Sequence, residues 1–529
     1  MKIEYLKISK FKNLNDFTLD LSGNSNDILV TVGKNGTGKS NFLEAIVLIF
    51  RDLIMEENNP PFSYELRYEC RERIIEVKVN IQDRTKYLYS VDGVKKTKVD
   101  FYKKDEIGFI HLPEYIFAYY SGISNRLEKH FDSPQKKFYN DLKNGVDRAF
   151  RPLFYARPIH SNFVLLAFYA FEDDNIKDFL EEYLNITGFD SSLFVVTEPD
   201  WTSPSGNKQF WNARGIVSKF LEKLIAKSLA PIKDKVEVRQ DFRHSDIKEC
   251  WYLFLENQAK LQELASEYTT NVAFFKALES TYISDLIYET RIRVQKKNLT
   301  DGSMTFKELS EGEQQLLTVL GLLKFTNNAE SLFLLDEPDT HLSPIWGHEY
   351  LKVLKKISGE YGRSQMFLSS HKPTTISGLT QDQIITFEKE KVQETENEFI
   401  TACPSKISAK GLSADGILTQ IFGMEYTYDE DTYNDMLERR RLVAKQKFEP
   451  GTLTEVEKET LTKLTNELSD YSENYADGLF YEFINELDKT GGLSAYRLVD
   501  LSDEEKDKRR KLADDLLRKL KQKRLDSKP

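Results

Sequence analysis

The sequence predicts an α/β fold, a mixed β-sheet with flanking helices that is split by a helical insertion and followed by a helical C-terminal region. Two observations predict the sheet. Residues 28–32 (ILVTV) form an apolar strand that leads into a glycine-rich loop and an apolar helix, and strand–helix alternation returns over residues 300–390. A third observation predicts the helical parts, because charged patterns of helical type fill residues 125–300 and the chain beyond residue 425.

Four segments follow from these patterns. Residues 1–125 and 300–425 form the two halves of the sheet domain, residues 126–299 form a mainly helical insertion, and residues 426–529 form the helical C-terminal region. A chain of 529 residues is too long for one simple core, so a division into several structural units is expected.

Individual elements support the sheet domain. The N-terminal residues alternate between apolar and polar side chains, which predicts an antiparallel strand pair. Residues 75–81 alternate in the same way, and Asp92-Gly93 predicts a tight hairpin turn. In the second half, residues 332–335 (LFLL) and 366–369 (MFLS) are typical of buried strands.

Composition and charge exclude several classes of protein. The 74 basic and 85 acidic residues give a net charge of −11, so contact with nucleic acid would need a local basic patch. Cys70, Cys250 and Cys403 lie far apart, which indicates free thiols in a reducing compartment without a zinc site. The longest apolar run, from Phe163 to Phe171, is shorter than the ~18 residues that span a bilayer. We therefore expect a soluble, cytoplasmic protein.

The glycine-rich loop GKNGTGKS matches the phosphate-binding pattern G-x-x-x-x-G-K-[ST] between a predicted strand and a predicted helix. Glycines let the backbone N–H groups point at phosphate oxygens, and the helix directs its positive end to the same place. Lys39 would bridge the β- and γ-phosphates, and the Ser40 hydroxyl would bind Mg²⁺. The nucleotide-binding candidates in this loop are Gly33, Asn35, Gly36, Gly38, Lys39 and Ser40.

Two carboxylates follow the strand LFLL. Asp336 is placed to hold Mg²⁺, and Glu337 is placed to polarise the attacking water. Many buried strands end in an acidic residue, so the assignment of these two carboxylates to an ATPase site depends on the neighbouring motifs.

The segment LSEGEQQ, which begins at Leu309, resembles the LSGGQ-type signature of ABC-type ATPases. In that family the signature serine and glycine bind the γ-phosphate held by the opposite subunit, which assigns this role to Ser310 and Gly312. His371, in MFLSSHKP, resembles the switch histidine that senses the γ-phosphate. Asp339 matches the D-loop, which crosses the dimer interface. The resemblance implies ATP and Mg²⁺ as ligands and a homodimer or higher oligomer that sandwiches two ATP molecules between its heads.

Within this family the chain resembles the SMC, RecF and OLD branch, which works on nucleic acid. Asn41, directly after the phosphate-binding Lys-Ser pair, carries this resemblance and is a further nucleotide-binding candidate. The interval from Ser40 to Leu309 is much longer than in transporter ATPases. Neither a long heptad array nor a C-x-x-C hook is present, and no convincing nuclease motif occurs in the chain.

A compact ATPase of this kind resembles the ATPase subunits (PtuA) of Septu-type and retron-associated anti-phage systems. Residues 117–122 with Arg126, and residues 411–415, carry this resemblance, although the aromatic run at 115–120 is equally typical of plain core. The resemblance implies a nucleotide-gated switch that assembles with and controls a separate nuclease of HNH type. The alternative is a DNA-repair ATPase of RecF or Rad50 type that acts directly on DNA.

Several assignments stay open at this stage. Gln82 is a candidate for the family's glutamine loop, and residues 11–13 are candidates for the purine contact. Nucleic acid is a candidate partner for two basic segments. One comprises Lys95, Lys96, Lys98, Lys103 and Lys104, and the other is the tail from Lys506 to Lys528. The tail alternates in sign, so docking to a partner or a solvated helix are its other interpretations.

Overall fold

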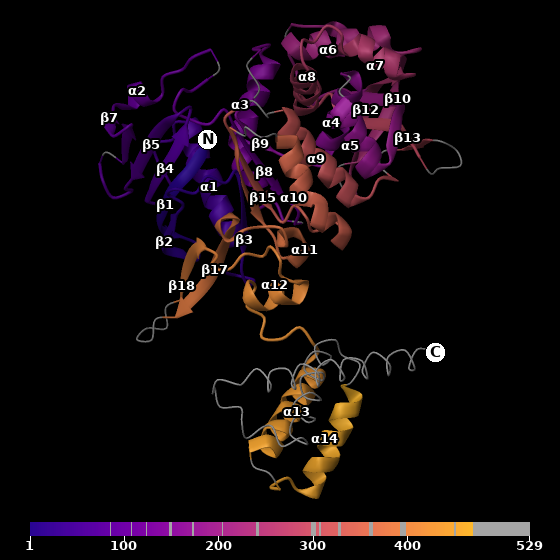
Figure 1. Ribbon diagram of the computed structural model, residues 1–529. Coiled ribbons are helices and arrows are strands. Elements are labelled where there is room, and N and C mark those ends of the chain that lie inside the picture. The colour runs from indigo at the N-terminus through magenta and orange to yellow at the C-terminus, as the bar shows by residue number, and fades with distance from the viewer. Residues whose placement is uncertain are drawn as a thin grey trace. The chain divides into compact units, whose positions relative to one another are not determined.

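The computed structural model describes residues 1–84, 86–106, 108–122, 124–147, 151–171, 174–203, 205–239, 243–297, 303–305, 308–325, 329–358, 363–391, 398–448 and 451–468. The chain divides into two compact units, Met1–Glu425 and Tyr426–Pro529 (Figure 1). The first unit contains all the residues that the sequence marks as candidates for nucleotide binding and hydrolysis.

A seven-stranded sheet forms the centre of the first unit. Its strand order is β18 (Glu398–Pro404), β17 (Ile384–Lys391), β3 (Ile28–Val32), β16 (Gln365–Ser369), β15 (Ser331–Asp336), β8 (Tyr115–Tyr120) and β9 (Leu153–Tyr155). All neighbours in this order pair in parallel except β17 and β18, which are antiparallel. The carboxyl ends of the parallel strands therefore meet at one edge of the sheet, where loops between elements commonly bind ligands.

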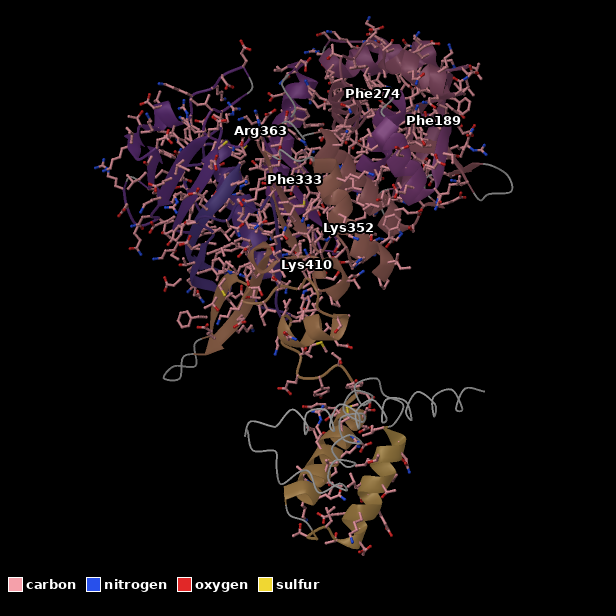
Figure 2. The ribbon with its side chains drawn as sticks, in the orientation of Figure 1. Phe189, Phe274, Phe333, Lys352, Arg363 and Lys410 are labelled. Carbon is pink, nitrogen blue, oxygen red and sulfur yellow. The ribbon has the colours of Figure 1, made fainter. Side chains whose placement is uncertain are left out.

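Helices cover both faces of this sheet because its strands alternate between two hydrophobic cores. In β3, Val30 packs into one core and Leu29 into the other. Helix α1 (Lys39–Ile54) belongs to the second core, whereas α9 (Glu311–Phe325) and α10 (Pro344–Ser358) belong to the first, on the other side of the sheet (Figure 1). Phe333 of β15 lies in the interior of the first core, stacked on Phe117 with ring centroids 4.9 Å apart (Figure 2). The predicted α/β head with a mixed sheet and flanking helices is confirmed.

A six-stranded antiparallel sheet lies over α1. Its order is β2 (Leu14–Asp20), β1 (Lys2–Phe11), β4 (Tyr64–Cys70), β5 (Arg73–Val79), β6 (Tyr87–Val91) and β7 (Val94–Lys96), followed by the short helix α2 (Lys98–Phe101). Asp92 and Gly93 form the two-residue turn between β6 and β7, both with positive φ (50° and 76°). A tight two-residue hairpin turn requires this backbone conformation. The hairpin predicted at Asp92-Gly93 is therefore present.

The expectation of a mainly helical insertion over residues 126–299 misses a five-stranded sheet, four strands of which lie in this range. The helices are α3 (Asp132–Lys143), α4 (Ile159–Ala170), α5 (Asp174–Leu184), α6 (Gly215–Lys227), α7 (Gln258–Ala265) and α8 (Asn271–Ile283). The strands are β11 (Ile232–Arg239), β12 (Ser245–Leu255), β10 (Ile186–Thr197), β13 (Ile287–Lys296) and β14 (Ser303–Thr305), all antiparallel. β11 and β13 alternate apolar residues with charges, and segments so rich in charge are also typical of exposed helices.

The border expected at residue 125 is not a border in the fold. β9, at Leu153–Tyr155, pairs with β8 as the outer strand of the central sheet. Helix α4 then packs against α9 so closely that a Cβ atom added at Gly321 would lie 2.1 Å from Val164 Cγ1. The insertion and the helix that follows LSEG therefore share one core.

The chain after the central sheet is helical where it is described. Helix α12 (Ala414–Gln420) closes the first unit, and α13 (Glu430–Phe448) and α14 (Glu455–Glu467) form the described part of the second. Met436, Leu464 and Leu468 pack together there. The basic tail from Lys506 to Lys528 lies outside the described residues. Within the described part of the chain, no helix combines the length and apolar character needed to cross a bilayer.

Candidate functional site

The candidate residues gather where strands β3, β15, β16 and β8 end. The phosphate-binding loop follows β3, Asp336 ends β15, His371 follows β16, and Ser121 follows β8. Register brings Asp336 level with Ser369 of β16 and with Tyr120 of β8. Parallel pairing thus assembles segments that lie more than 330 residues apart in the sequence.

Backbone conformation makes glycine necessary at key points of the loop. Gly33, Gly36 and Gly38 have φ values of 147°, 77° and 92°, in the region that side chains rarely tolerate. A Cβ atom at Gly33 would lie 2.4 Å from the carbonyl oxygen of Phe387, so the strand neighbour leaves room only for hydrogen. Helix α1 begins at Lys39 directly after Gly38, and its free N–H groups face the loop.

Lys39 is held inside the loop. Its Nζ donates to the carbonyl oxygens of Gly33 at 2.8 Å and Lys34 at 3.2 Å. Burial lowers the pKa of Lys39 to about 8, although Glu337 and Asp336 act in the opposite direction. The hydrogen bonds of this buried amine go to carbonyl oxygens throughout the described part of the chain, so it is well placed to exchange them for phosphate oxygens.

Asp336 is fully buried and incompletely satisfied. Its Oδ1 accepts a hydrogen bond from Ser369 Oγ at 2.5 Å, while its Oδ2 has no hydrogen-bond partner among the described residues. Burial raises the pKa of Asp336, and the hydroxyl groups of Ser369 and Ser40 oppose that rise. A buried carboxylate oxygen without a donor, beside the Ser40 hydroxyl, fits a hard cation such as Mg²⁺.

No group of three side chains suited to a metal gathers within the described residues. A Mg²⁺ ion at Asp336 and Ser40 would therefore depend on nucleotide oxygens and water for its other ligands. This is the usual arrangement for Mg²⁺, which is bound through one or two carboxylates together with substrate phosphates.

Glu337 adopts a strained backbone conformation, with φ of 53°. Its N–H donates to Ser369 Oγ at 2.9 Å, so the same hydroxyl binds both carboxylate residues. The Glu337 side chain is partly exposed, and its Oε1 lies 3.5 Å from His371 Nε2. The strained turn directs this carboxylate out of the strand and toward the histidine.

His371 is held largely in its neutral form. Burial lowers the pKa of His371, and the nearby Lys39 amine lowers it further. A neutral imidazole can donate from one ring nitrogen and accept at the other, which suits a group between a carboxylate and a phosphate.

Asp339, the residue that matches the D-loop, is buried and bonded within its own chain. The Asp339 side chain is 1% exposed, and its Oδ2 accepts hydrogen bonds from Ser370 Oγ at 2.6 Å and Thr375 Oγ1 at 2.5 Å. These bonds tie the loop after β15 to the segment that carries His371. Asp339 thus fixes the loop from inside its own subunit, and the exposed residues that follow, Thr340 and His341, lie at its surface.

Ser310 and Gly312 lie at the start of α9. Ser310 is exposed; its Oγ accepts from the Glu313 N–H at 3.3 Å, and its backbone N–H donates to Glu313 Oε2 at 2.8 Å, which together form a capping box. A Cβ atom at Gly312 would lie 2.7 Å from the carbonyl oxygen of His341. Among the described residues neither Ser310 nor Gly312 hydrogen-bonds to the loop at 33–40, so the two parts stay separate within one chain.

Asn41 takes a supporting position that sequence reasoning did not foresee. Its Nδ2 donates to Asn13 Oδ1 at 2.6 Å, and Asn13 Nδ2 donates in turn to the carbonyl oxygen of Gly36 at 3.0 Å. Arg126 donates to Asn41 Oδ1. The turn between β1 and β2 is therefore fastened to the phosphate-binding loop through side-chain amides.

Glu44 connects the same segments one turn further along α1. Its buried carboxylate accepts from Lys12, from Arg126 Nη2 at 3.0 Å, and pairs with His130 Nε2 at 2.9 Å. Burial alone would raise the pKa of Glu44, but hydrogen bonds from His130, Lys12 and Arg126 lower it to about 2. The sequence offered one signal, since a lone acid in the apolar helix NFLEAIVLIF needs a partner.

Gln82 lies away from this site, in the exposed turn after β5 of the six-stranded sheet. The position beside the carboxylates at the end of β8 is taken by Ser121, whose Oγ lies 3.1 Å from Thr340 Oγ1. The residues that follow Ser121 lead to Arg126, so an arginine rather than a glutamine reaches the start of α1 from this segment.

A family model described as "AAA domain, putative AbiEii toxin, Type IV TA system" matches residues 28–377. The match begins with β3 and extends past His371, so it includes the phosphate-binding loop, the signature, both carboxylates and the histidine. The chain belongs to this AAA family. The ATPase expected from the motifs is thereby confirmed at the level of the family.

Two curated proteins are similar to this AAA ATPase in sequence. The Septu protein PtuA of Bacillus mycoides (strain KBAB4) is 24% identical over 247 residues, which cover 44% of this chain and 32% of PtuA. The retron Vc95 probable ATPase of Vibrio cholerae serotype O1 biovar El Tor is 20% identical over 411 residues, 72% of this chain and 71% of the relative. The chain thus spans about a third of PtuA. The predicted resemblance to Septu-type and retron-associated ATPases is confirmed.

Among solved structures, the SMC head domain from Thermotoga maritima aligns with a TM-score of 0.31 at 14% identity, covering 77% of this chain and all of that domain.

Proposed function

We propose that this AAA ATPase is a nucleotide-gated switch, in which two heads close around two ATP molecules and thereby control a separate nuclease in cytoplasmic anti-phage defence. One observation carries the proposal. Lys39, Asp336, Glu337 and His371 converge at the end of the central sheet, whereas the exposed Ser310 makes no hydrogen bond to the phosphate-binding loop among the described residues. A site that is complete except for its signature fits closure by a second subunit.

In the closed state each residue would have a defined task. Lys39 would exchange the carbonyl oxygens of Gly33 and Lys34 for phosphate oxygens. Ser40 and the free Oδ2 of Asp336 would hold Mg²⁺, which supplies charge neutralisation on the β- and γ-phosphates.

Glu337 would orient the attacking water and accept its proton, because its carboxylate is partly exposed at the edge of the loop. His371, neutral and 3.5 Å from Glu337, would hydrogen-bond the γ-phosphate and so report its presence to the segment that Asp339 anchors. Ser310 and Gly312 of the opposite head would bind the same phosphate.

Closure would then act as a switch because ATP makes contacts in the closed dimer that it lacks in separate heads. The absence of a nuclease motif in the sequence motivates a separate partner, and the Septu and retron relatives motivate its defence role.

The test uses Glu337→Gln, which keeps ATP binding but removes the proton acceptor. The variant, expressed with its neighbouring genes, is expected to form a stable dimer with ATP and to release no phosphate, as measured by light scattering and phosphate release. Lys39→Ala, which loses the phosphate contact, is the control that should stay open. Native mass spectrometry of the purified complex should reveal a stoichiometric nuclease. A lone dimer without a nuclease that binds DNA ends would instead favour the repair ATPase.

A further inference from the structure

A strongly basic groove lies on the six-stranded sheet, and none of its lining residues is a nucleotide candidate. It has a volume of about 720 Å³ and is lined mainly by β5, β6, β7 and the start of α2. Its cationic side chains are Lys78, Arg84, Lys86, Lys95, Lys96 and Lys98, and Glu76 is the carboxylate among the lining residues. Such a concentration of one sign of charge is unexpected in a chain whose net charge is −11.

Most of these cations are not neutralised. Lys78 pairs with Glu65 at 2.7 Å, but Lys86 and Lys98 bind the neutral amides of Asn59 and Asn58 at 2.8 and 2.9 Å. Arg84, Lys95 and Lys96 form no ion pair within the described residues. The groove therefore presents free positive charge that an anionic partner can use.

Rigid neighbours fix the positions of these side chains. The tight turn at Asp92-Gly93 sets the register of β6 and β7, which places Lys95 opposite Ser90 and Lys96 opposite Tyr89. Tyr89 stacks on Phe101 of α2, with ring centroids 4.2 Å apart. The groove is therefore a built surface whose strands are held by hydrogen bonds and aromatic packing.

The width of the groove indicates the size of the partner that it can bind. Its cations come from β5, the turn after β5, β7 and α2, with β6 between them, and three adjacent strands at the usual spacing span about 10 Å. That span exceeds a single phosphate group and suits a chain of phosphates. Partly exposed Tyr87 and the exposed Leu88 (57%) add apolar surface against which bases can pack.

We propose that this groove binds the phosphodiester backbone of a nucleic acid. The inference goes beyond the proposed nuclease switch and does not rest on it, because no groove residue belongs to the nucleotide site. The contact is with backbone phosphates, so it gives affinity and position rather than sequence specificity.

The experiment measures fluorescence anisotropy of labelled single-stranded and duplex DNA with the full-length chain over a series of salt concentrations. The parent chain is expected to bind at least one of the two, with a linear fall of log affinity against log salt. Lys95→Glu/Lys96→Glu is expected to weaken binding by about tenfold or more and to reduce the salt slope by about 1 to 2.

Two variants serve as matched controls. Lys95→Arg/Lys96→Arg keeps the charge and should bind like the parent. Lys219→Glu/Lys235→Glu makes the same change in net charge at exposed positions outside the groove and should also bind like the parent. Basal ATP hydrolysis should be unchanged in every variant, which separates this test from that of the nuclease switch.

Three outcomes would overturn the proposal. One is an absence of DNA binding by the parent chain at low salt. Another is equal weakening by the groove and control charge reversals, since that would indicate a general effect of net charge. The third is stronger binding of labelled polyglutamate than of DNA, because the groove would then be a site for an acidic peptide.

Discussion

The Lys39 amine is poised to change its proton affinity when a nucleotide arrives. In the free protein burial lowers its pKa to about 8 from an ordinary 10.5. Bound phosphate favours the charged amine, so the pKa rises again in the complex. Above about pH 8 the free protein must therefore take up a proton to bind ATP.

This gives a prediction for binding as a function of pH. We expect ATP affinity to fall as the pH rises through about 8, with net proton uptake on binding, measured by calorimetry in two buffers of different ionisation enthalpy. Lys39→Arg is the control, because a guanidinium stays protonated and should show no proton uptake at this residue. Affinity that is constant between pH 7 and 9 would contradict the prediction.

Glu44 makes a second prediction at the scale of one residue. Its folded-state pKa of about 2 lies below the ordinary 4.5, so its contribution to stability is present above about pH 4.5 and is lost as the pH falls toward 2. Glu44→Gln should cost about 3 kcal/mol near neutral pH, because it leaves Lys12, Arg126 and His130 without their carboxylate.

Thermal unfolding checks this value. The midpoint difference between parent and Glu44→Gln should be large at pH 7 and should shrink as the pH falls below about 4.5. Glu57→Gln removes an exposed carboxylate just beyond the same helix and should leave the midpoint unchanged. A difference that does not depend on pH would show that packing, and not charge, is responsible.

At the scale of elements, the contact of α4 with α9 joins the insertion to the helix that begins with Ser310 and Gly312. Gly321→Ala should lower stability by about 1–3 kcal/mol, because its Cβ would lie 2.1 Å from Val164 Cγ1. Val164→Ala removes the clashing methyl groups, so the double variant should recover part of the loss in a thermal double-mutant cycle. Gly378→Ala, where a Cβ meets nothing within 4 Å, should be neutral.

The secondary-structure elements also show how far the fold can be predicted from the sequence. The strand–loop–helix around Lys39 and the strand before Asp336 were predictable because their signals are local and their apolar runs are continuous. The five-stranded sheet was not, since β11 and β13 place charges on an exposed face at a spacing that resembles charged helix.

Side-chain contacts between residues far apart in the sequence were equally unpredictable. The sequence around each residue does not indicate that Ser369 donates a hydrogen bond to Asp336. It also does not indicate that Asn13 donates one to the carbonyl oxygen of Gly36. Asp339 shows the same limit, because its motif does not reveal that Ser370 and Thr375 bury its carboxylate.

At the scale of the whole molecule, the separation of Ser310 from the loop at 33–40 predicts complementation between subunits. Lys39→Ala and Ser310→Arg should each be inactive alone. When they are mixed, a heterodimer regains one intact site, so random pairing should restore about a quarter of parental phosphate release. Each variant mixed with itself is the control. An inactive mixture that still forms heterodimers would place the signature within its own subunit.

The position of β3 has a consequence for how the protein is made. This strand carries the phosphate-binding loop and lies between β16 and β17, which are encoded more than 330 residues later. The hairpins of the six-stranded sheet can pair as soon as they leave the ribosome, whereas β3 keeps both edges open until about seven tenths of the chain has been synthesised. Nascent chains that stop before residue 365 would thus expose an unpaired apolar strand. Capacity to bind ATP would appear late and abruptly during translation, once residues 365–386 have inserted on both sides of the loop-bearing strand.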